Sequence, residues 1–566
     1  MSKEIKSEIT NTIKKLYATH DGIDSSIIEV NRTSDNSHGD LYTNVAMKLA
    51  KILKKNPLAI AEEISRNLNL INIIEKIEIA PPGYINFYLP KSNKFNELNR
   101  IINDDLLVLQ ESNKKNIHIE YVSANPTGPL HIGHGRGMIV GDVTARFLSS
   151  QGHSVNREYY VNDAGRQIDL LLVSALLSYL NKEDHVFSDE KDNDDGRLVT
   201  YKGSYIKDVS RTISSVLKDI NNQDVLNLLN EPIDVLINYL KNHKNYLNIR
   251  KSLVNVIIDQ YIKKDLLSVN IEFDSWFNES DLYESGLLEE VLTEIDDKSL
   301  SYKKDGALWF KNTKFGEDKD RVLIKSNGDM TYFATDIAYH VYKFKHYDLL
   351  IDIWGADHHD YASRLTTAMK ALGYDVKNRL QIHLIQFANL VRGSKSISMS
   401  TRSGDFYPIQ DLVKEIGSDA TKYFYLTKKK EQHLEFDVDL AIEKNKNNPI
   451  YYIQYAHARI TKIIDNLDTD IIQKEDFNNL NTKNENDIID LINLYQDTIN
   501  KSLKEIRPDI ITNYLYKISQ IFHSYYAETK ILTSNIKGER IMLIKCIDKI
   551  ILNGLQLLNI KPMDKM

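Results

Sequence analysis

The chain has almost no cysteine and no long apolar run. Its single cysteine, Cys546, cannot form an internal disulfide and cannot by itself supply a Cys-rich zinc site, so the sequence fits a reducing compartment. No stretch approaches the roughly twenty apolar residues that a membrane span needs. Residues 1–16 have neither an uninterrupted apolar core nor a small-residue cleavage site. These absences predict a cytoplasmic protein with no signal peptide and no membrane anchor.

The chain also lacks an excess of basic residues. It carries 72 Lys and Arg against 79 Asp and Glu, a net charge of −7, which argues weakly against binding a polyanion through overall charge. A nucleic-acid partner would therefore need local basic faces. The length of 566 residues exceeds what one hydrophobic core serves, so about three or four domains are expected. The 42% hydrophobic and 27% charged content is ordinary for a soluble globular protein.

The most informative stretch is residues 124–137, which read ANPTGPLHIGHGRG. Upstream, residues 117–122 alternate in the manner of a strand, and residues 125–129 break that strand with a Pro/Gly-rich turn. Downstream, residues 138–148 have helical spacing. A strand, a turn and a helix N-terminus in this order expose backbone N–H groups and the positive end of a helix dipole, which together suit a nucleotide's phosphates.

Two histidines, His131 and His134, lie at the mouth of this junction. On the H-x-G-H motif alone, surface or capping histidines on a glycine-rich loop are the commoner explanation. The rest of the chain has to decide between that structural role and a functional one.

The remaining sequence divides by pattern into regions. Residues 1 to about 110 mix helical periodicity with two short strands and predict a small α+β module, including a helix over about 41–53. From residue 117 strands alternate with helices, which predicts a parallel sheet with right-handed crossovers. Between about 163 and 304 the strand signal largely vanishes and helical segments replace it, so an insertion is expected. Beyond about residue 439 the pattern is nearly all helical.

Strand signals return after the insertion, at residues 307–310, 322–324 and 349–354, and the last of these ends at residues 355–359, GADHH. In doubly wound α/β folds, ligands bind beyond the carboxyl ends of the strands, where the strand order reverses. Both residues 125–134 and residues 355–359 are expected at such ends.

A second loop, residues 393–405, reads GSKSISMSTRSGD and carries Lys395 and Arg402. Taken alone, a Ser/Gly loop of this kind is usually a solvated connection. Its position after a nucleotide-type sheet favours transient contact with a triphosphate, because cations on a mobile loop can meet the charge that builds in a transition state.

Together these motifs resemble the paired signatures of class I aminoacyl-tRNA synthetases, with HIGH at 131–134 and SMSTR at 398–402, where a KMSKS-type loop would lie. Within that class the chain resembles the arginyl-tRNA synthetases, through further stretches at 159–167 (YYVNDAGRQ), 331–336 (TYFATD) and 354–359 (WGADHH). The resemblance covers essentially the whole chain. It implies an α/β fold: a Rossmann-like parallel-sheet catalytic domain with a helical insertion, an N-terminal α+β module and a C-terminal all-α helical bundle.

The resemblance also implies domain boundaries. An N-terminal additional tRNA-binding domain would occupy 1–112, and a class I catalytic domain 113–440, with its insertion at about 163–304 and its KMSKS-type loop at 393–405. A helical anticodon-binding domain would occupy 441–566. The insertion should position the acceptor end of the tRNA and carries no pattern typical of an editing site. A monomer is expected, because the family is mostly monomeric.

The implied reaction is ATP-dependent activation of L-arginine to arginyl-adenylate, followed by transfer to the 2′-OH of the 3′-terminal adenosine of tRNA(Arg). Activation would require the tRNA. ATP would bring Mg²⁺ with it, and neither a tightly bound cofactor nor a protein metal site is expected. His131 and His134 are implied to stabilise the in-line transition state. The residues implied to bind ATP are Pro126, Gly128, His131, Gly133, His134, Met399 and Ser400.

Arginine itself makes a chemical demand on its pocket. A guanidinium has five donors and a permanent charge, so it needs carboxylates and oriented acceptors. Asp336 follows Tyr332 by four residues, which on a helix puts both on one face; without the resemblance, an exposed i,i+4 pair would be the simpler interpretation. The residues implied to bind arginine are Glu120, Ser123, Asn125, Tyr332, Asp336 and His358.

The KMSKS-type loop departs from the general pattern. Ser398 occupies the position of the first lysine and Thr401 that of the second, which ordinarily meets the triphosphate. Threonine occurs at that second position among arginyl enzymes. Lys395 and Arg402 are the local candidates to replace the missing cation in catalysis.

One C-terminal helix, over about residues 450–464, has two contrasting faces. His457 lies on its apolar stripe, which favours a core histidine. Tyrosines interleaved with cations suit stacking on unpaired bases and pairing with phosphates, although such a face is more often only solvated surface. The resemblance favours tRNA binding by the residues of that face, Tyr451, Tyr455, Arg459 and Lys462.

Two other classes of function stay open on the sequence. The chain could be a nucleotidyltransferase-superfamily enzyme that acts on a small molecule, but the helical C-terminal region and the N-terminal module would then be unexplained. It could instead be a catalytically silent RNA-binding relative, against which the intact His131, Gly133, His134, Tyr332 and Asp336 count.

Overall fold

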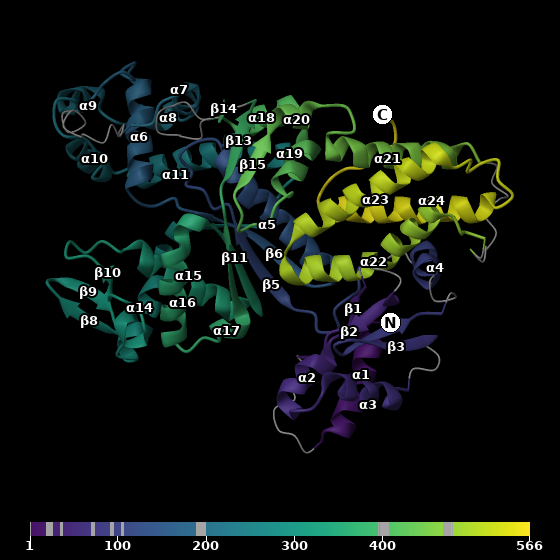
Figure 1. Ribbon diagram of the computed structural model, residues 1–566. Helices are drawn as coiled ribbons and strands as arrows, with labels where there is room; N and C mark the ends of the chain where they lie inside the picture. The colour runs from purple at the N-terminus through teal and green to yellow at the C-terminus, as the bar shows by residue number, and fades with distance from the viewer. Residues whose placement is uncertain are drawn as a thin grey trace. The chain divides into compact units, whose positions relative to one another are not determined.

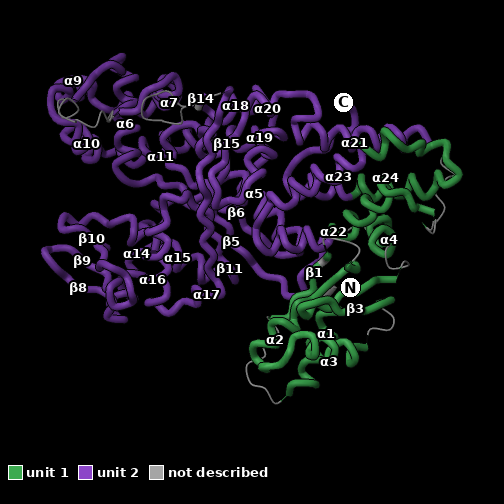
Figure 2. Tube along the Cα trace, in the orientation of Figure 1, with its two compact units in different colours: residues 1–105, 468–495, 524–549 green, residues 106–467, 496–523, 550–566 purple. Residues whose placement is uncertain are grey.

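The structure is a computed structural model of the 566-residue chain, shown in Figure 1. The residues that it describes are 2–18, 27–33, 38–69, 74–90, 95–103, 107–187, 200–393, 395–396, 407–467, 477 and 479–566. The chain forms two compact units, distinguished by colour in Figure 2. Unit 1 comprises residues 1–105, 468–495 and 524–549, and unit 2 comprises residues 106–467, 496–523 and 550–566.

The N-terminal part of unit 1 is an α+β module. Its antiparallel sheet has the order β1-β2-β4-β3. The strands are β1 (Asn31–Arg32), β2 (Leu41–Thr43), β3 (Lys76–Ala80) and β4 (Tyr84–Tyr88). The helices are α1 (Ser2–Leu16), α2 (Val45–Leu53), α3 (Pro57–Asn67) and α4 (Asn96–Asn103). The predicted periodicity of α1 is confirmed, since Ile5, Ile9 and Ile13 are buried in the core of this module.

One predicted helix of this module begins later than expected. The segment 41–53 is a strand, β2, followed by α2, and not a single helix. Leu41 and Thr43 are both buried with a half-exposed Tyr42 between them, and β2 pairs antiparallel with β4. This alternation of period two belongs to a strand, but three residues are too few for it to stand out beside the longer helical pattern that follows.

Unit 2 is built on a parallel sheet of five strands in the order β12-β11-β5-β6-β7. All four strand pairs are parallel. The strands are β5 (Asn116–Tyr121), β6 (Ser154–Val161), β7 (Ser275–Asn278), β11 (Leu349–Gly355) and β12 (Leu380–Ile385). The helix α5 (Ile132–Ser150) packs on β5, β6 and β11. The predicted Rossmann-like parallel-sheet fold is therefore confirmed.

The sequence pattern missed β7 and misassigned the strands after the insertion. β7 lies inside the segment expected to be helical, but it pairs with β6 and forms an edge of the parallel sheet. The strands β8 (Ser301–Lys304), β9 (Ala307–Phe310) and β10 (Arg321–Ile324) form a separate antiparallel sheet of three strands. The four residues of β7 give too short a pattern to identify, and its partner β6 is more than a hundred residues away in sequence.

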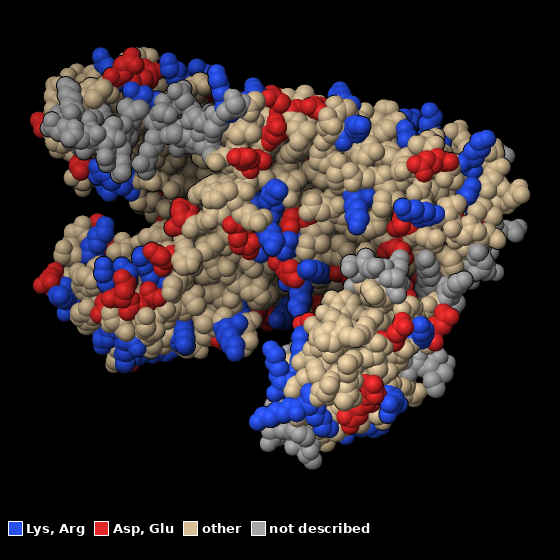
Figure 3. Space-filling view, viewed as in Figure 1, with Lys and Arg blue, Asp and Glu red and all other residues tan. Residues whose placement is uncertain are grey.

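The helices of unit 2 fall into groups that Figure 1 separates. The insertion holds α6 (Arg166–Tyr179), α7 (Ser204–Thr212), α8 (Ser214–Leu217), α9 (Asn222–Leu228), α10 (Ile233–Lys241), α11 (Tyr246–Ile257) and α12 (Lys263–Ser268). A second group accompanies the small sheet: α13 (Glu279–Glu284), α14 (Leu287–Asp297), α15 (Tyr332–His346), α16 (His359–Ala371) and α17 (Val376–Arg379). Figure 3 shows unit 2 hollowed between these two groups, with side chains of both charge signs interspersed over the face that is drawn.

A third sheet has three strands in the order β14-β13-β15. It contains β13 (Ala388–Arg392), β14 (Lys395–Ser396) and β15 (Leu434–Asp437), and its neighbouring helices are α18 (Ile409–Ile416), α19 (Ser418–Tyr425) and α20 (Val438–Ile442).

The C-terminal region is all-helical in its described part, as predicted. Its helices are α21 (Pro449–Asp465), α22 (Lys483–Glu505), α23 (Pro508–Glu528) and α24 (Lys537–Leu557). Asn448 caps α21 by accepting from the N–H of Tyr451, and Pro449 occupies the first turn, where its missing N–H costs nothing. Within the described residues, no helix has the length and apolar content to cross a membrane.

Candidate active site

The two signature histidines begin α5 and cap it. His131 is the N-cap residue, and its side chain accepts a hydrogen bond from the N–H of Gly133 at 3.0 Å through Nδ1. His134 accepts from the N–H of His131 at 3.2 Å through its own Nδ1. The two rings lie 3.9 Å apart, and together they form a capping box. The two histidines therefore cap α5, and they lie at the helix N-terminus that the sequence predicts as a phosphate site.

The protonation of these histidines follows from their surroundings. Burial lowers the pKa of His131 to about 4 and that of His134 to about 3, the latter also through the neighbouring His131. Both imidazoles are therefore neutral at pH 7. Since each Nδ1 accepts a backbone N–H, each Nε2 carries the proton and is able to donate to an anionic oxygen.

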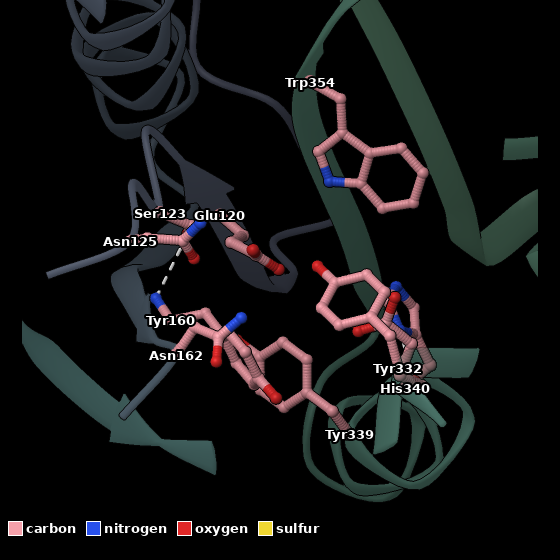
Figure 4. A pocket seen from close by; sticks show the side chains of 10 residues that line it. Glu120, Ser123, Asn125, Tyr160, Asn162, Tyr332, Tyr339, His340 and Trp354 are labelled. Atoms are coloured by element: carbon pink, nitrogen blue, oxygen red, sulfur yellow. Dashed lines mark hydrogen bonds between the residues drawn. The ribbon is translucent and has the colours of Figure 1, made fainter. Parts of the chain in front are cut away.

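A narrow recess of about 40 Å³ lies beyond the carboxyl end of β5. In Figure 4, Glu120, Ser123 and Asn125 face Tyr332 and Trp354 across it. The hydroxyl of Ser123 accepts from the N–H of Tyr160 at 3.1 Å, which is the dashed line of the figure. The residues that line the recess are Glu120, Ser123, Asn125, Tyr160, Asn162, Tyr332, Asp336, Tyr339, His340 and Trp354. Five of the six residues predicted to bind arginine are thus brought together.

Buried charges support one side of this recess. Nζ of Lys343, which is fully buried, donates to Glu120 Oε2 at 2.8 Å and to Asp352 Oδ1 at 2.7 Å. Nε2 of His340 lies 2.9 Å from Asp352 Oδ2, and its Nδ1 lies 2.8 Å from the backbone oxygen of Asp336. A continuous chain of hydrogen bonds therefore connects Glu120 at one end of the recess with Asp336 at the other.

Asp336 is a buried carboxyl group, 5% exposed, with a hydroxyl donor, that of Tyr361, and a strongly shifted pKa. Burial raises its pKa well above the usual value, and the nearby carboxylates of Glu120 and Glu279 raise it further, against the lowering effects of Tyr361 and Lys343. A cation placed in the recess would reverse this balance, because it would favour the charged form.

The structure reveals an acidic residue that sequence reasoning missed. Glu279 is 6% exposed and begins α13, directly after β7. The side-chain amide of Asn162, which lines the recess, donates to Glu279 Oε2 at 2.7 Å. Burial raises the pKa of Glu279 to about 7, and Asp163 adds to the shift. Only recognition of β7 as a strand of the sheet could have placed Glu279 behind this recess.

A wider pocket of about 350 Å³ adjoins the recess and shares several of its lining residues. Gly133 and His134 line it from α5, and His358 lines it from the segment after β11. The half-exposed ring of Phe387 closes another side. Its lining also includes Ser123, Asn125, Tyr332, Trp354, Asp357 and Gln386. His358 therefore belongs to the wider pocket rather than to the recess.

Two residues predicted to bind ATP lie elsewhere on the same turn. Gly128 faces the ring of Tyr205 on α7, which a Cβ at position 128 would meet at 3.1 Å. The hydroxyl of Tyr205 donates to the backbone oxygen of Thr127 at 2.9 Å. Pro126 is buried. Pro126 and Gly128 are not among the residues that line the wider pocket, and neither is His131.

Of the second signature loop, residues 393–405, the structure describes only residues 393, 395 and 396. Lys395 is exposed in β14, where it pairs with Arg392 of β13. Met399, Ser400 and Arg402 lie outside the described residues. Where the chain resumes, at residue 407, it is hydrogen-bonded to the first signature: the N–H of Ile132 donates to the oxygen of Tyr407 at 3.1 Å.

A buried arginine holds α5 in place. Arg136 is 1% exposed, and its guanidinium donates to four backbone carbonyls, those of Gln386, Lys428, Lys429 and Gln432. Burial lowers its pKa to about 10, so it stays charged at pH 7. Carbonyl oxygens gathered around one guanidinium fix the loops that follow β12 and α19 relative to α5.

The predicted two-faced helix is α21. Its apolar stripe is buried, including His457, which is 3% exposed and lies 3.1 Å from Asp564, as expected of a core histidine. On the other face the rings of Tyr451 and Tyr455 are stacked, 6.3 Å apart. The guanidinium of Arg459 lies over the Tyr455 ring at 4.4 Å.

Lys462 continues this face of α21 as an exposed cation. The four residues predicted to bind tRNA therefore form one aromatic and basic strip.

In the described part of the chain, no group of three or more His, Cys, Asp or Glu side chains is arranged to hold a metal ion.

Family comparisons cover nearly the whole chain. Residues 97–466 match the catalytic domain of the class I tRNA synthetases (R), residues 453–566 match the DALR anticodon binding domain, and residues 3–89 match the arginyl-tRNA synthetase N-terminal domain. An arginine–tRNA ligase of Nitrosomonas europaea is 38% identical over 560 residues, with 94% of each chain covered. One of Hydrogenovibrio crunogenus is 37% identical over 597 residues, with 99% of each chain covered.

Solved structures show the same fold. A Campylobacter jejuni structure, described as a proposed arginyl-tRNA synthetase, is 32% identical with a TM-score of 0.71, covering 84% of this chain and all of its own. The arginyl-tRNA synthetase of Thermus thermophilus has a TM-score of 0.74 at 18% identity and covers both chains fully.

Proposed function

The chain belongs to the class I arginyl-tRNA synthetase family, and on that premise we propose how its residues join arginine to tRNA. In the first step the carboxylate of L-arginine attacks the α-phosphate of ATP, which forms arginyl-adenylate and releases diphosphate. In the second, the 2′-OH of the 3′-terminal adenosine of tRNA(Arg) attacks the activated carbonyl and releases AMP. Neither step needs a covalent enzyme intermediate, so positioning and charge stabilisation carry the catalysis.

The acidic recess is the observation that carries this assignment. Asp336 is buried with an unusually high pKa, and Glu279 stands behind it with a pKa of about 7. A guanidinium brings five donors and a permanent charge, so it would satisfy both carboxylates and return their pKa values toward normal. The half-exposed ring of Tyr332 offers its face to the same group. An amino-acid substrate with a neutral or acidic side chain would make none of these charged contacts.

The other end of the recess suits the substrate's α-amino and carboxylate groups. Glu120 has one carboxylate oxygen held by Lys343, which leaves Oε1 for an ammonium group. Ser123 and Asn125 lie beside it on the turn after β5. This arrangement would direct the substrate carboxylate out of the recess and toward the wider pocket, where the nucleotide would lie.

The wider pocket suits ATP in shape and electrostatics. Its wall includes the N-terminus of α5, whose helix dipole favours an anion. We assign His134, which lines this pocket, and the neighbouring His131, which does not, to donate their Nε2 protons to phosphate oxygens as negative charge develops. Gly133 on this wall would let the nucleotide approach the backbone. Mg²⁺ would arrive bound to the phosphates, as part of the substrate.

The remaining parts of the chain fit a tRNA partner. The strip of Tyr451, Tyr455, Arg459 and Lys462 on α21 offers ring faces and cations for unpaired bases and phosphates. We assign residues 441–566 to anticodon binding, residues 1–112 to an additional tRNA contact and residues 113–440 to catalysis. The protein is proposed to act as a cytoplasmic monomer.

Amino-acid-dependent exchange of diphosphate into ATP tests this function. The exchange is measured across all twenty amino acids, with and without tRNA(Arg). Exchange with arginine alone, and only when tRNA is present, is the expected result. Exchange with a different amino acid, or with none under any condition, would contradict the assignment.

The recess assignment has its own test. Asp336→Asn removes the charge but keeps the shape, so it should raise the KM for arginine by about 100-fold, a typical cost of losing one buried partner of a charged pair. The KM for ATP should change little, because Asp336 does not line the wider pocket. Equal changes in both constants would argue against a guanidinium contact.

A further inference from the structure

One buried carboxylate touches the first signature without being part of either pocket. Asp265 belongs to α12, the last helix of the insertion, and is 2% exposed. Its Oδ2 accepts a hydrogen bond from the backbone N–H of Leu130 at 2.6 Å, one residue before His131. It also accepts from the side chain of Gln410 on α18. A single side chain from the insertion therefore contacts both the residue before the first signature and the helix α18.

The two segments that Asp265 contacts are also bonded to each other. His131 and Pro408 form an isolated antiparallel bridge. The N–H of Ile409 donates to the oxygen of Leu130 at 3.0 Å, on the same residue whose N–H is held by Asp265. Leu130 is 1% exposed, so neither of its backbone groups can turn to water instead. These bonds fix the register between residues 407–409 and the segment that begins the first signature.

Asp265 is costly to bury. In the described part of the chain, no Lys or Arg lies within ion-pair distance of it, and the other titratable groups that face it are Asp411 on α18 and Tyr159 on β6. Burial raises the pKa of Asp265 to about 7, and Asp411 adds to the shift, against the lowering effect of its two donors. Asparagine would accept the same backbone N–H without a buried charge, so stability alone does not account for an aspartate here.

We propose that Asp265, which belongs to the helical insertion, is a positioning residue for arginine activation. It holds the Leu130–Ile132 segment in register with the Tyr407–Ile409 segment. This inference rests on the proposed function. A carboxylate accepts more strongly than an amide, so the ionised side chain holds the N–H of Leu130 most firmly. His131, which follows directly, is then held as the N-cap of α5, and Ile132 stays bonded to Tyr407.

The proposal has a definite pH dependence. The ionised form is the one that positions the bridge, so the activation rate should rise as the pH passes from about 6 to about 8. His131 and His134 titrate far below this window. Glu279 titrates within it, but at the arginine recess. Rates are therefore measured at saturating arginine, where the bound substrate keeps the protonation state of Glu279 constant.

The experiment compares wild type with Asp265→Asn in diphosphate exchange with tRNA present, from pH 6 to pH 8.5. We expect kcat at pH 8 to fall by about tenfold, an amount typical of a lost positioning contact, with the KM for arginine changed by less than about threefold. We also expect the rise in kcat near pH 7 to disappear, and the melting temperature at pH 8 to be equal to or higher than that of wild type, because a buried charge is removed.

Asp259→Asn serves as the matched control. Asp259 precedes α12 on the same continuous helical segment and pairs with Lys263 at 2.7 Å on an exposed surface, so its variant should match wild type. If Asp265→Asn keeps the wild-type rate and pH profile, the proposal is wrong. A parallel loss of rate and melting temperature with an unaltered pH profile would reduce Asp265 to a structural role and overturn it too. A wild type without arginine-dependent exchange would overturn the proposed function itself.

Discussion

At the scale of single residues, the recess combines one paired and one unpaired carboxylate. Glu120 is neutralised by Lys343, which Asp352 also holds. Asp336 has only a hydroxyl donor, that of Tyr361, and no cation in the described structure lies within ion-pair distance of its carboxylate. The recess without substrate is therefore short of one positive charge at its Asp336 end. A substrate that carries that charge on a planar, multi-donor group completes the network that connects Asp336 to Glu120.

The first prediction concerns the pH dependence of arginine binding. Because the pKa of Asp336 is raised in the free protein and a bound guanidinium lowers it, binding should release protons, and the affinity for arginine should rise with pH until the free carboxyl is ionised. Isothermal titration calorimetry in buffers of different ionisation enthalpy measures the released protons. Asp336→Asn should release fewer, and Glu279→Gln separates the contribution of Glu279, whose pKa is about 7. An affinity that stays constant between pH 6 and pH 8 would contradict the prediction.

The second prediction concerns the missing lysines of the second loop. Lys395 is an exposed cation at the start of that loop, and it is the nearest described replacement in sequence. Lys395→Ala should slow adenylate formation about tenfold or more, the scale expected for one charged transition-state contact. Lys395→Arg keeps the charge and should retain most of the rate in a single-turnover assay. If the alanine variant reacts like wild type, the role moves to Arg402 or to a lysine elsewhere in the chain.

At the scale of elements, α5 is fitted closely to its neighbours at one face and open at another. A Cβ on Gly135 would lie 2.6 Å from the ring of Tyr425, a fully buried residue of α19. The hydroxyl of Tyr425 donates to the oxygen of Ile132 at 2.8 Å, in the first turn of α5. At Gly137, half a turn further on, a Cβ would meet nothing within 4 Å.

The third prediction uses this contrast between two glycines of one helix. Gly135→Ala should destabilise the protein by about 1–3 kcal/mol, the usual cost of overpacking a core, because the Tyr425 ring cannot move without losing its bond to Ile132. Gly137→Ala should be neutral or stabilise by up to about 1 kcal/mol, since alanine is the better helix former. Thermal and denaturant unfolding measure both. Equal stability of the two variants would contradict close packing of Gly135 against Tyr425.

The sequence predicted those elements whose pattern is local. The strand predicted at residues 349–354 is confirmed as β11, Leu349–Gly355, because its residues carry their own strand pattern. The strand-turn-helix junction at His131 was equally local. Glu279 could not be found this way, since it reaches the recess only through the pairing of β7 with β6. Arg136 was also missed as a structural residue, because its four carbonyl partners lie roughly 250 to 300 residues away in sequence.

At the scale of the whole molecule, the last residues of the chain return to the catalytic part of unit 2. Asn559 donates to Asp142 on α5 at 2.7 Å and to the backbone oxygen of Asn270 at 2.8 Å, and it accepts from the Asn270 amide at 2.8 Å. Two residues on, the oxygen of Lys561 accepts from Gln454 on α21 at 2.7 Å. The C-terminal segment thus joins the helix that starts at the signature histidines to the helix that carries the aromatic and basic strip.

The last prediction tests this connection. Asn559 has a φ of +58°, so Asn559→Gly fits the backbone and removes only the side-chain bonds. It leaves Asp142, which is 1% exposed, without its amide donor and should cost about 1–3 kcal/mol of stability in denaturant unfolding. Lys561→Ala is the control, because the contact of that residue is made by its backbone and should survive. If the tail also couples tRNA binding to activation, Asn559→Gly should lower tRNA-stimulated exchange by more than it lowers tRNA affinity, whereas equal losses would restrict the tail to stabilising unit 2.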